Sequence, residues 1–132
     1  MNIILWIWQF PQHLLALLLL LIFRGTKDKG FYKIVSPKWW EFGASLGNYV
    51  MFSEQYVNSF ILFPKFEDQT VKHEQGHSIQ SRWLGPLYLP TVGLVSATQN
   101  LICRIIPYSK YAKDYYKRWP ENWADKLAGI KR

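Results

Sequence analysis

The hydrophobic pattern begins with one long apolar segment. Residues 3–23 contain no Asp, Glu, Lys or Arg. As a helix, this segment would run roughly 31 Å, about the thickness of the hydrocarbon core of a bilayer. Pro11, Gln12 and His13 interrupt it, which predicts a kink or a polar spot that faces other parts of the protein. The pattern favours a transmembrane helix.

A cleaved signal peptide is the alternative for the same segment. Signal peptides carry positive charge before the apolar run and small residues at a cleavage site after it. No Lys or Arg precedes this run, and its end reads LLLLLIFRGTKDKG, without a small-residue cleavage site. We therefore expect an uncleaved anchor over residues 1–24. The basic residues after it place its C-terminal end in the cytoplasm, which predicts a cell (inner) membrane protein with its site on or near the cytoplasmic face.

The remaining residues, 25–132, mix strand-like and helical patterns and predict one small α+β domain. Residues 50–52 and 60–63 are short apolar runs of β-formers, bounded by Gly, Asn and Pro. We expect a small antiparallel β-hairpin or meander there. Asp68 or Thr70 can cap a helix that runs to about Leu84, where a Gly-Pro pair stops it.

A second uncharged stretch follows, over residues 83–103. Its glycines and prolines make it a poor straight helix, so we expect a re-entrant or interfacial helical hairpin that turns near Pro90 and Gly93. The basic tail after it predicts a C-terminal helix that starts at Pro120.

Composition adds information about partners. The formal net charge is +7 and aromatic residues make up 17% of the chain. No nucleic-acid-binding motif accompanies the basic residues, so nucleic acid is not an expected partner. Membrane lipid is expected instead, and a membrane-complex partner or a homo-oligomer remains open. Cys103 is the single cysteine, which excludes an internal disulfide.

The helix that ends near Leu84 carries the sequence HEQGH. His73 and His77 are four residues apart, so they share one helix face and can bind one metal ion. Glu74 lies beside them, where its carboxylate can hold a water and act as a general base. The same five letters can also arise by chance on a helix, so a third ligand has to be found.

The tail contains a candidate for that ligand. Glu121 and Asp125 are also four residues apart. Catalytic zinc commonly binds two His and one Glu, and a ligating His usually donates its other N–H to a carboxylate. We expect Glu121 to bind the metal and Asp125 to orient a histidine. If both are only solvated charges, Glu41, Glu54 and Glu67 are the next candidates.

HEQGH followed by ENWAD resembles the gluzincin zinc metallopeptidases. It is similar in pattern to the CAAX prenyl proteases, the membrane heat-shock proteases and the minigluzincins, and to small bacterial membrane proteins with an HEYGH-type motif and an LGPLYL-type stretch. The resemblance covers roughly residues 43–129. It implies Zn²⁺ as the cofactor, with these roles: His73, His77 and Glu121 as ligands, Glu74 as general base and Asp125 as the residue that orients a His.

Peptide hydrolysis also needs a donor to the developing oxyanion. Tyr115, Tyr116 and Arg118 lie close to Glu121 in sequence and are candidates, although each can equally be an interfacial aromatic or a surface charge. The sequence thus predicts a membrane-anchored zinc metalloendopeptidase. Its substrate would be a membrane-proximal peptide or protein, added as a strand to the edge of the hairpin.

Two other functions stay open at this point. One is a non-catalytic zinc-binding subunit of a membrane protein complex. The other is a basic module on the membrane surface that binds no metal.

Overall fold

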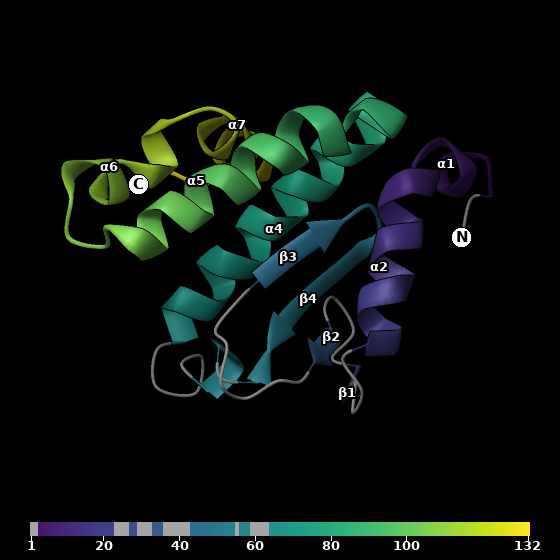
Figure 1. Cartoon of the computed structure of the whole chain (residues 1–132), viewed down its shortest axis with the longest axis horizontal. Coiled ribbons are helices and arrows are strands. Elements are labelled where there is room, and N and C mark those ends of the chain that lie inside the picture. Colours follow the sequence, from purple (N-terminus) through teal and green to yellow (C-terminus); the bar gives the residue numbers. More distant parts are fainter. Residues whose placement is uncertain (1–2, 23–26, 29–32, 36–42, 55, 59–63) are drawn as a thin grey trace.

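The computed structural model describes residues 3–22, 27–28, 33–35, 43–54, 56–58 and 64–132 (Figure 1). The N-terminal elements are α1 (Ile3–Trp8), α2 (Phe10–Ile22), β1 (Lys27–Asp28), β2 (Lys33–Val35), β3 (Gly43–Leu46) and β4 (Tyr49–Ser53). The C-terminal elements are α4 (Pro64–Leu84), η1 (Gly85–Leu87), η2 (Leu89–Gly93), α5 (Leu94–Ile105), α6 (Lys110–Lys113), η3 (Tyr115–Lys117) and α7 (Glu121–Ala128).

The strands form one mixed sheet in the order β1-β2-β4-β3. β3 and β4 make an antiparallel hairpin in which Ala44 lies opposite Met51, whereas β2 runs parallel to β4. The prediction of a small antiparallel hairpin or meander in an α+β domain is therefore corrected: β3 and β4 form such a hairpin, but the sheet is small and mixed and the described chain is mostly helical. The parallel pairing between β2 and β4 joins segments that no local pattern links. The strand expected over residues 60–63 lies outside the described residues. Among the described strands, β3 has a neighbour on one side only.

Alternation along β4 divides the core between two faces of the sheet. Met51 packs with Leu46 and with Ala16 of α2. Its neighbours Val50 and Phe52 point the other way, where Val71 of α4 packs against them. Successive residues of a strand point to opposite faces, so α2 covers one face and α4 the other. Figure 1 shows α2 along one side of the strands, with α4, α5 and α7 gathered on the other.

The buried side of the N-terminal helices is polar. Gln12 donates from its amide nitrogen to the hydroxyl of Ser81 (2.9 Å) and to the carbonyl of Gly85 (2.8 Å). The hydroxyl of Ser81 in turn donates to Gln9 Oε1 at 2.7 Å. These contacts join the N-terminal helices to the end of α4. The exposed side is apolar and includes Ile3, Ile7, Leu14, Leu18, Leu21 and Ile22.

His13 joins the same helix to the turn between β3 and β4. The backbone N–H of Asn48 donates to His13 Nε2 at 3.0 Å, so Nε2 carries no proton. Nδ1 must then carry one and donate it to the carbonyl of Trp6 at 2.9 Å. Burial lowers the pKa of His13, although the bond to Trp6 opposes that effect. His13 is therefore a neutral, fully buried cross-link.

Among the described residues, no helix combines the length and the apolar character needed to cross a membrane. The predicted membrane-anchor helix is therefore wrong, and the cell (inner) membrane location that was inferred from it is corrected with it. The physical reason is that the apolar stretch is divided. α1 has 6 residues and α2 has 13, and 13 helical residues span only about 20 Å.

Residues 83–103 were predicted as a re-entrant or interfacial helical hairpin; its placement in a membrane is corrected together with the anchor, whereas the chain does turn back over residues 85–93. α4 ends at Leu84, as expected, but it begins at Pro64 rather than near Asp68 or Thr70. The chain then turns through the short helices η1 and η2 and returns as α5. The return brings α5 beside the tail, where Gln99 donates to the carbonyl of Trp119 at 2.9 Å. The tail forms α7 directly after Pro120, as predicted.

The His13 cross-link gives a first prediction. His13→Ala removes the partner of the Asn48 N–H and of the Trp6 carbonyl. Each buried polar group left unsatisfied costs about 1–3 kcal/mol, so we expect a loss of roughly 2–4 kcal/mol in the free energy of unfolding. Urea denaturation measures this loss. Leu14→Ala is the control, since Leu14 is exposed. An equal loss in both variants would show that the histidine's hydrogen bonds contribute nothing.

Candidate metal site

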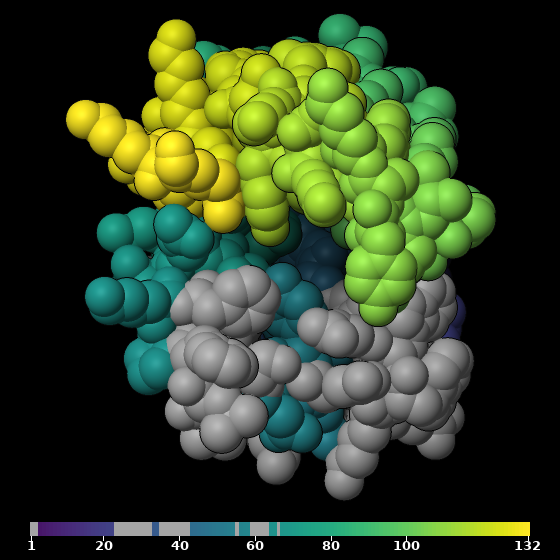
Figure 2. Space-filling view, turned by 90° about the vertical axis from the view of Figure 1, so that its left-hand side faces the viewer, coloured from purple at the N-terminus to yellow at the C-terminus, as the bar shows by residue number. Residues whose placement is uncertain are grey.

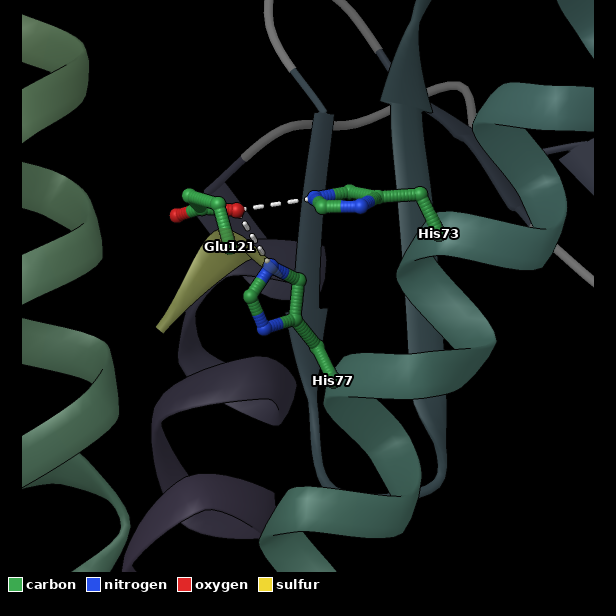
Figure 3. Close-up of side chains that lie close together, drawn as sticks. All are labelled: His73, His77 and Glu121. Atoms are coloured by element: carbon green, nitrogen blue, oxygen red, sulfur yellow. Dashed lines mark hydrogen bonds and ion pairs between the residues drawn. The ribbon is translucent and has the colours of Figure 1, made fainter. Parts of the chain in front are cut away.

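α4 has two buried faces, one packed against the sheet and one directed toward α7. Val71 and Ser78 face the sheet, where Val71 packs on Phe52 and the hydroxyl of Ser78 lies 2.9 Å from that of Ser45. His73 and His77 point instead toward α7 (Figure 3). They lie one helical turn apart, as their spacing predicts. Glu121, the first residue of α7, meets both of them.

One carboxylate oxygen of Glu121 lies between the two imidazoles (Figure 3). Glu121 Oε2 is 2.8 Å from His73 Nε2 and 2.9 Å from His77 Nε2. All three residues are buried, and Glu121 is 0% exposed. The other carboxylate oxygen accepts a hydrogen bond from the hydroxyl of Ser96 on α5. Glu121 is thus held by α4 on one side and by α5 on the other.

The outer nitrogen of each histidine is also engaged. His73 Nδ1 donates to Asp125 Oδ1 at 2.7 Å, which is the contact that the sequence predicts for Asp125. His77 Nδ1 lies 2.7 Å from Gln80 Oε1. Gln80 donates its amide N–H to the carbonyl of Pro120 at 3.0 Å, so its oxygen faces His77 and must accept. Both Nδ1 atoms carry a proton, which directs both Nε2 atoms toward Glu121.

The negative charge of the buried Glu121 carboxylate has to be compensated by positive charge nearby. Burial raises the pKa of Glu121, but the hydrogen bonds from His73 and His77 outweigh burial and lower it, so the carboxylate is ionised. Burial lowers the pKa of His77, but Glu121 and Glu74 outweigh it and raise that pKa to about 9. Two Nε2 atoms that converge on an ionised oxygen require a cation between them. Protons can supply that charge, and so can a metal ion.

The donor set fits a metal ion. One ligand atom from each of His73, His77 and Glu121 lies within 4.8 Å of the other two. Zinc binds nitrogen and carboxylate oxygen at about 2.0–2.2 Å, so tetrahedral ligand atoms lie roughly 3.3–3.5 Å apart. Outward shifts of about half an ångström are enough to admit such an ion. These three residues can therefore hold a metal ion.

Glu74 lies beside this cluster but is not part of it. Its carboxylate lines a cavity of about 170 Å³ together with His77 and Tyr115. Burial raises the pKa of Glu74, and the charges of His77 and His73 oppose that rise. All four residues of β3 form one wall of this cavity. Tyr88, Gly93 and three residues of α5 form the rest: Ser96, Ala97 and Asn100. Figure 2 shows a hollow in the surface that the yellow-green C-terminal segments border, with dark blue atoms at its floor.

The three candidate oxyanion donors have different surroundings. Tyr115 lines the cavity, and burial together with the charge of Glu121 raises its pKa, so its hydroxyl keeps its proton. Tyr116 packs its ring edge-on against His73, with 5.1 Å between ring centroids, and does not line that cavity. Arg118 donates to the carbonyl of Tyr111 at 2.7 Å and stacks on its ring. Tyr115 is the one of the three that faces the cavity.

Neither of the two alternative glutamates that the structure describes belongs to the site, whereas two residues that were not predicted do. Glu41 lies outside the described residues, and within the described part of the chain the metal-binding group includes neither Glu54 nor Glu67. Gln80 was missed, although its position three residues after His77 puts it on the same helix face. Ser96 was also missed, and it carries no signal, because it lies in an uncharged stretch.

Comparison of the chain with protein-family models, with curated proteins and with solved structures found no match. The assignment of a function therefore rests on the geometry described above.

The two helices that carry the candidate ligands meet at Gly76, and this contact gives a second prediction. A Cβ at position 76 would lie 2.1 Å from the carbonyl oxygen of Ala124 on α7. Gly76→Ala must push α7 away from α4 and carry Glu121 with it. We expect a loss of about 1–3 kcal/mol in stability and weaker binding of Zn²⁺, measured by thermal unfolding and by titration against a chelator.

Gln75→Ala is the matched control, because Gln75 is the neighbouring residue on α4 and is partly exposed. Normal metal affinity in Gly76→Ala would show that α7 can move without disturbing the cluster.

Proposed function

We propose that this protein is a zinc-dependent peptidase. Two His and one Glu are the protein ligands of many catalytic zinc ions, whereas structural zinc sites have four protein ligands. The resemblance of HEQGH and ENWAD to the gluzincins supports the same conclusion. One observation carries the proposal: Glu74 lines the cavity beside His77 while it stays outside the ligand group. A purely structural metal site has no use for a carboxylate in that position.

The residues divide the work of peptide hydrolysis. A zinc ion held by His73, His77 and Glu121 would supply a Lewis acid and lower the pKa of a water in the site. Glu74 accepts a proton from that water as the water oxygen attacks the substrate's carbonyl carbon. When the C–N bond breaks, Glu74 delivers the proton to the leaving amine. Glu74 lines the cavity beside His77 without belonging to the ligand group, so its carboxylate can exchange protons with a water there.

Tyr115 and β3 complete the arrangement. Negative charge develops on the substrate's carbonyl oxygen, and the protonated Tyr115 hydroxyl lines the same cavity and can donate to that oxygen. Gly43, Ala44, Ser45 and Leu46 form the edge strand β3 and all line the cavity. An extended peptide can add to this edge as a further strand. The hydroxyl of Tyr88 already donates to the carbonyl of Ser45 at 3.1 Å, so the peptide would pair toward Gly43.

The role of Glu121 as a ligand is tested by measuring the zinc content of alanine variants. Glu121→Ala leaves two histidines and removes the ionised oxygen that both Nε2 atoms approach. We expect it to lose stoichiometric Zn²⁺ at neutral pH, as measured by metal analysis after gel filtration. Asp114→Ala is the control, since Asp114 pairs with Lys117 at the surface. Equal losses in the two variants would remove Glu121 from the site.

The role of Glu74 is tested by Glu74→Gln, which keeps the shape of the side chain and removes the base. We expect it to retain Zn²⁺ and to lower peptide hydrolysis by about 10²- to 10⁴-fold. The measurement is cleavage of a peptide library followed by mass spectrometry, with chelated and zinc-restored wild type as references. Unchanged hydrolysis in Glu74→Gln would contradict the proposal. Zinc binding by a wild type that cleaves nothing would favour a non-catalytic zinc-binding protein.

A further inference from the structure

The residues after α7 fold back along it. Gly129 has a φ of 74°, in the left-handed region where glycine is favoured. The N–H of Gly129 donates to the carbonyl of Lys126 at 3.2 Å, and the N–H of Ile130 donates to that of Asp125 at 2.9 Å. This pair of bonds is a Schellman motif, which ends a helix by reversing the chain. The reversal brings Arg132 back to the side chain of Asp125.

Arg132 makes three kinds of contact from this position. Its Nε and Nη2 bond to Asp125 Oδ2 and Oδ1 at 2.6 and 3.2 Å. Its Nη1 donates to Gln69 Oε1 on α4 at 3.3 Å. Its guanidinium carbon lies 3.5 Å from the centroid of the Tyr116 ring. One side chain therefore connects the tail, α4 and η3.

Two of the residues that Arg132 contacts, Asp125 and Tyr116, are also in contact with His73. Asp125 Oδ1 is the oxygen that accepts the proton of His73 Nδ1 at 2.7 Å. The Tyr116 ring is perpendicular to the His73 ring, with 5.1 Å between centroids. Arg132 thus fixes the carboxylate that sets the tilt of the imidazole and the ring that packs against it. A paired guanidinium also compensates the charge of Asp125, which is buried and would be costly alone.

We infer that Arg132 is a positioning residue for the metal site, acting on His73 through Asp125 and Tyr116. The inference rests on the metal-binding role of His73 in the proposed function. The planar guanidinium suits this role, because it can bond both oxygens of a carboxylate while it stacks on an aromatic ring. A lysine carries the same charge, but it cannot bond both carboxylate oxygens in a bidentate manner or stack a planar group on the ring. Metal affinity should therefore depend on the identity of residue 132 and not only on its charge.

The test compares Arg132→Ala, Arg132→Lys and Lys131→Ala in the full chain. We expect Arg132→Ala to weaken Zn²⁺ binding by about 10-fold, at the low end of the 10- to 100-fold range for losing the partner of a ligating histidine, because Arg132 acts one step behind that partner. Arg132→Lys should be intermediate. Lys131→Ala should match wild type, because Lys131 shares the same turn and is exposed. Affinity is measured by competition with a chelator, and the visible spectrum of bound Co²⁺ reports any change in ligand geometry.

A double-mutant cycle identifies the route. If Arg132 acts through Asp125, adding Arg132→Ala to Asp125→Ala should weaken Zn²⁺ binding by less than about threefold, clearly less than its effect in wild type. Any residual effect measures the remaining contacts of Arg132, with Tyr116 and with Gln69. Arg132→Lys keeps the test decisive if Arg132→Ala does not fold.

The outcomes separate the two ideas. Wild type that binds Zn²⁺ but cleaves no peptide contradicts the peptidase proposal and leaves this inference standing. Variants of Arg132 with the affinity and Co²⁺ spectrum of wild type overturn the inference alone, and so does a Lys131→Ala variant that is equally impaired. Wild type that binds no Zn²⁺ overturns both.

Discussion

The structure depends on the buried carboxylate of Glu121. A carboxylate that is 0% exposed is costly unless every oxygen is compensated. Both are: one meets His73 and His77, and the other accepts a hydrogen bond from Ser96. These partners lie on α4 and α5, so α7 can dock only where the two helices present them together. The choice of polar residues for this part of the interior therefore fixes where the C-terminal half of the chain packs.

The sequence predicted the centre of the site better than its surroundings. The spacing of His73 and His77 is a property of one helix, and the Glu-x-x-x-Asp pair is a property of another, so both could be read locally. The donor that faces the cavity could not. Tyr115 and Tyr116 are adjacent, and the short η3 turn decides which of them lines the cavity. Arg132 was missed because its role depends on a chain reversal at Gly129.

The fold was predicted less well, for a related reason. Apolar composition predicted a membrane segment over residues 3–23, because a count of apolar residues cannot detect the long-range hydrogen bonds of its polar residues. Gln9, Gln12 and His13 pair with Ser81, Gly85 and Asn48. These partners are up to 73 positions away along the chain. The parallel pairing of β2 with β4 is equally non-local. Local patterns predicted the end of α4 and the start of α7, because Gly and Pro act on their immediate neighbours.

The supports of the two histidines converge on one segment. His73 is held by Asp125 and His77 by Gln80, which itself donates to the carbonyl of Pro120. The segment from Pro120 to Asp125 thus provides the third candidate ligand and fixes both imidazoles. Gly76 allows this segment to touch α4 through its backbone. Ligand geometry and docking of α7 are consequently one event, and a metal ion that binds the docked arrangement must stabilise the whole C-terminal half of the protein.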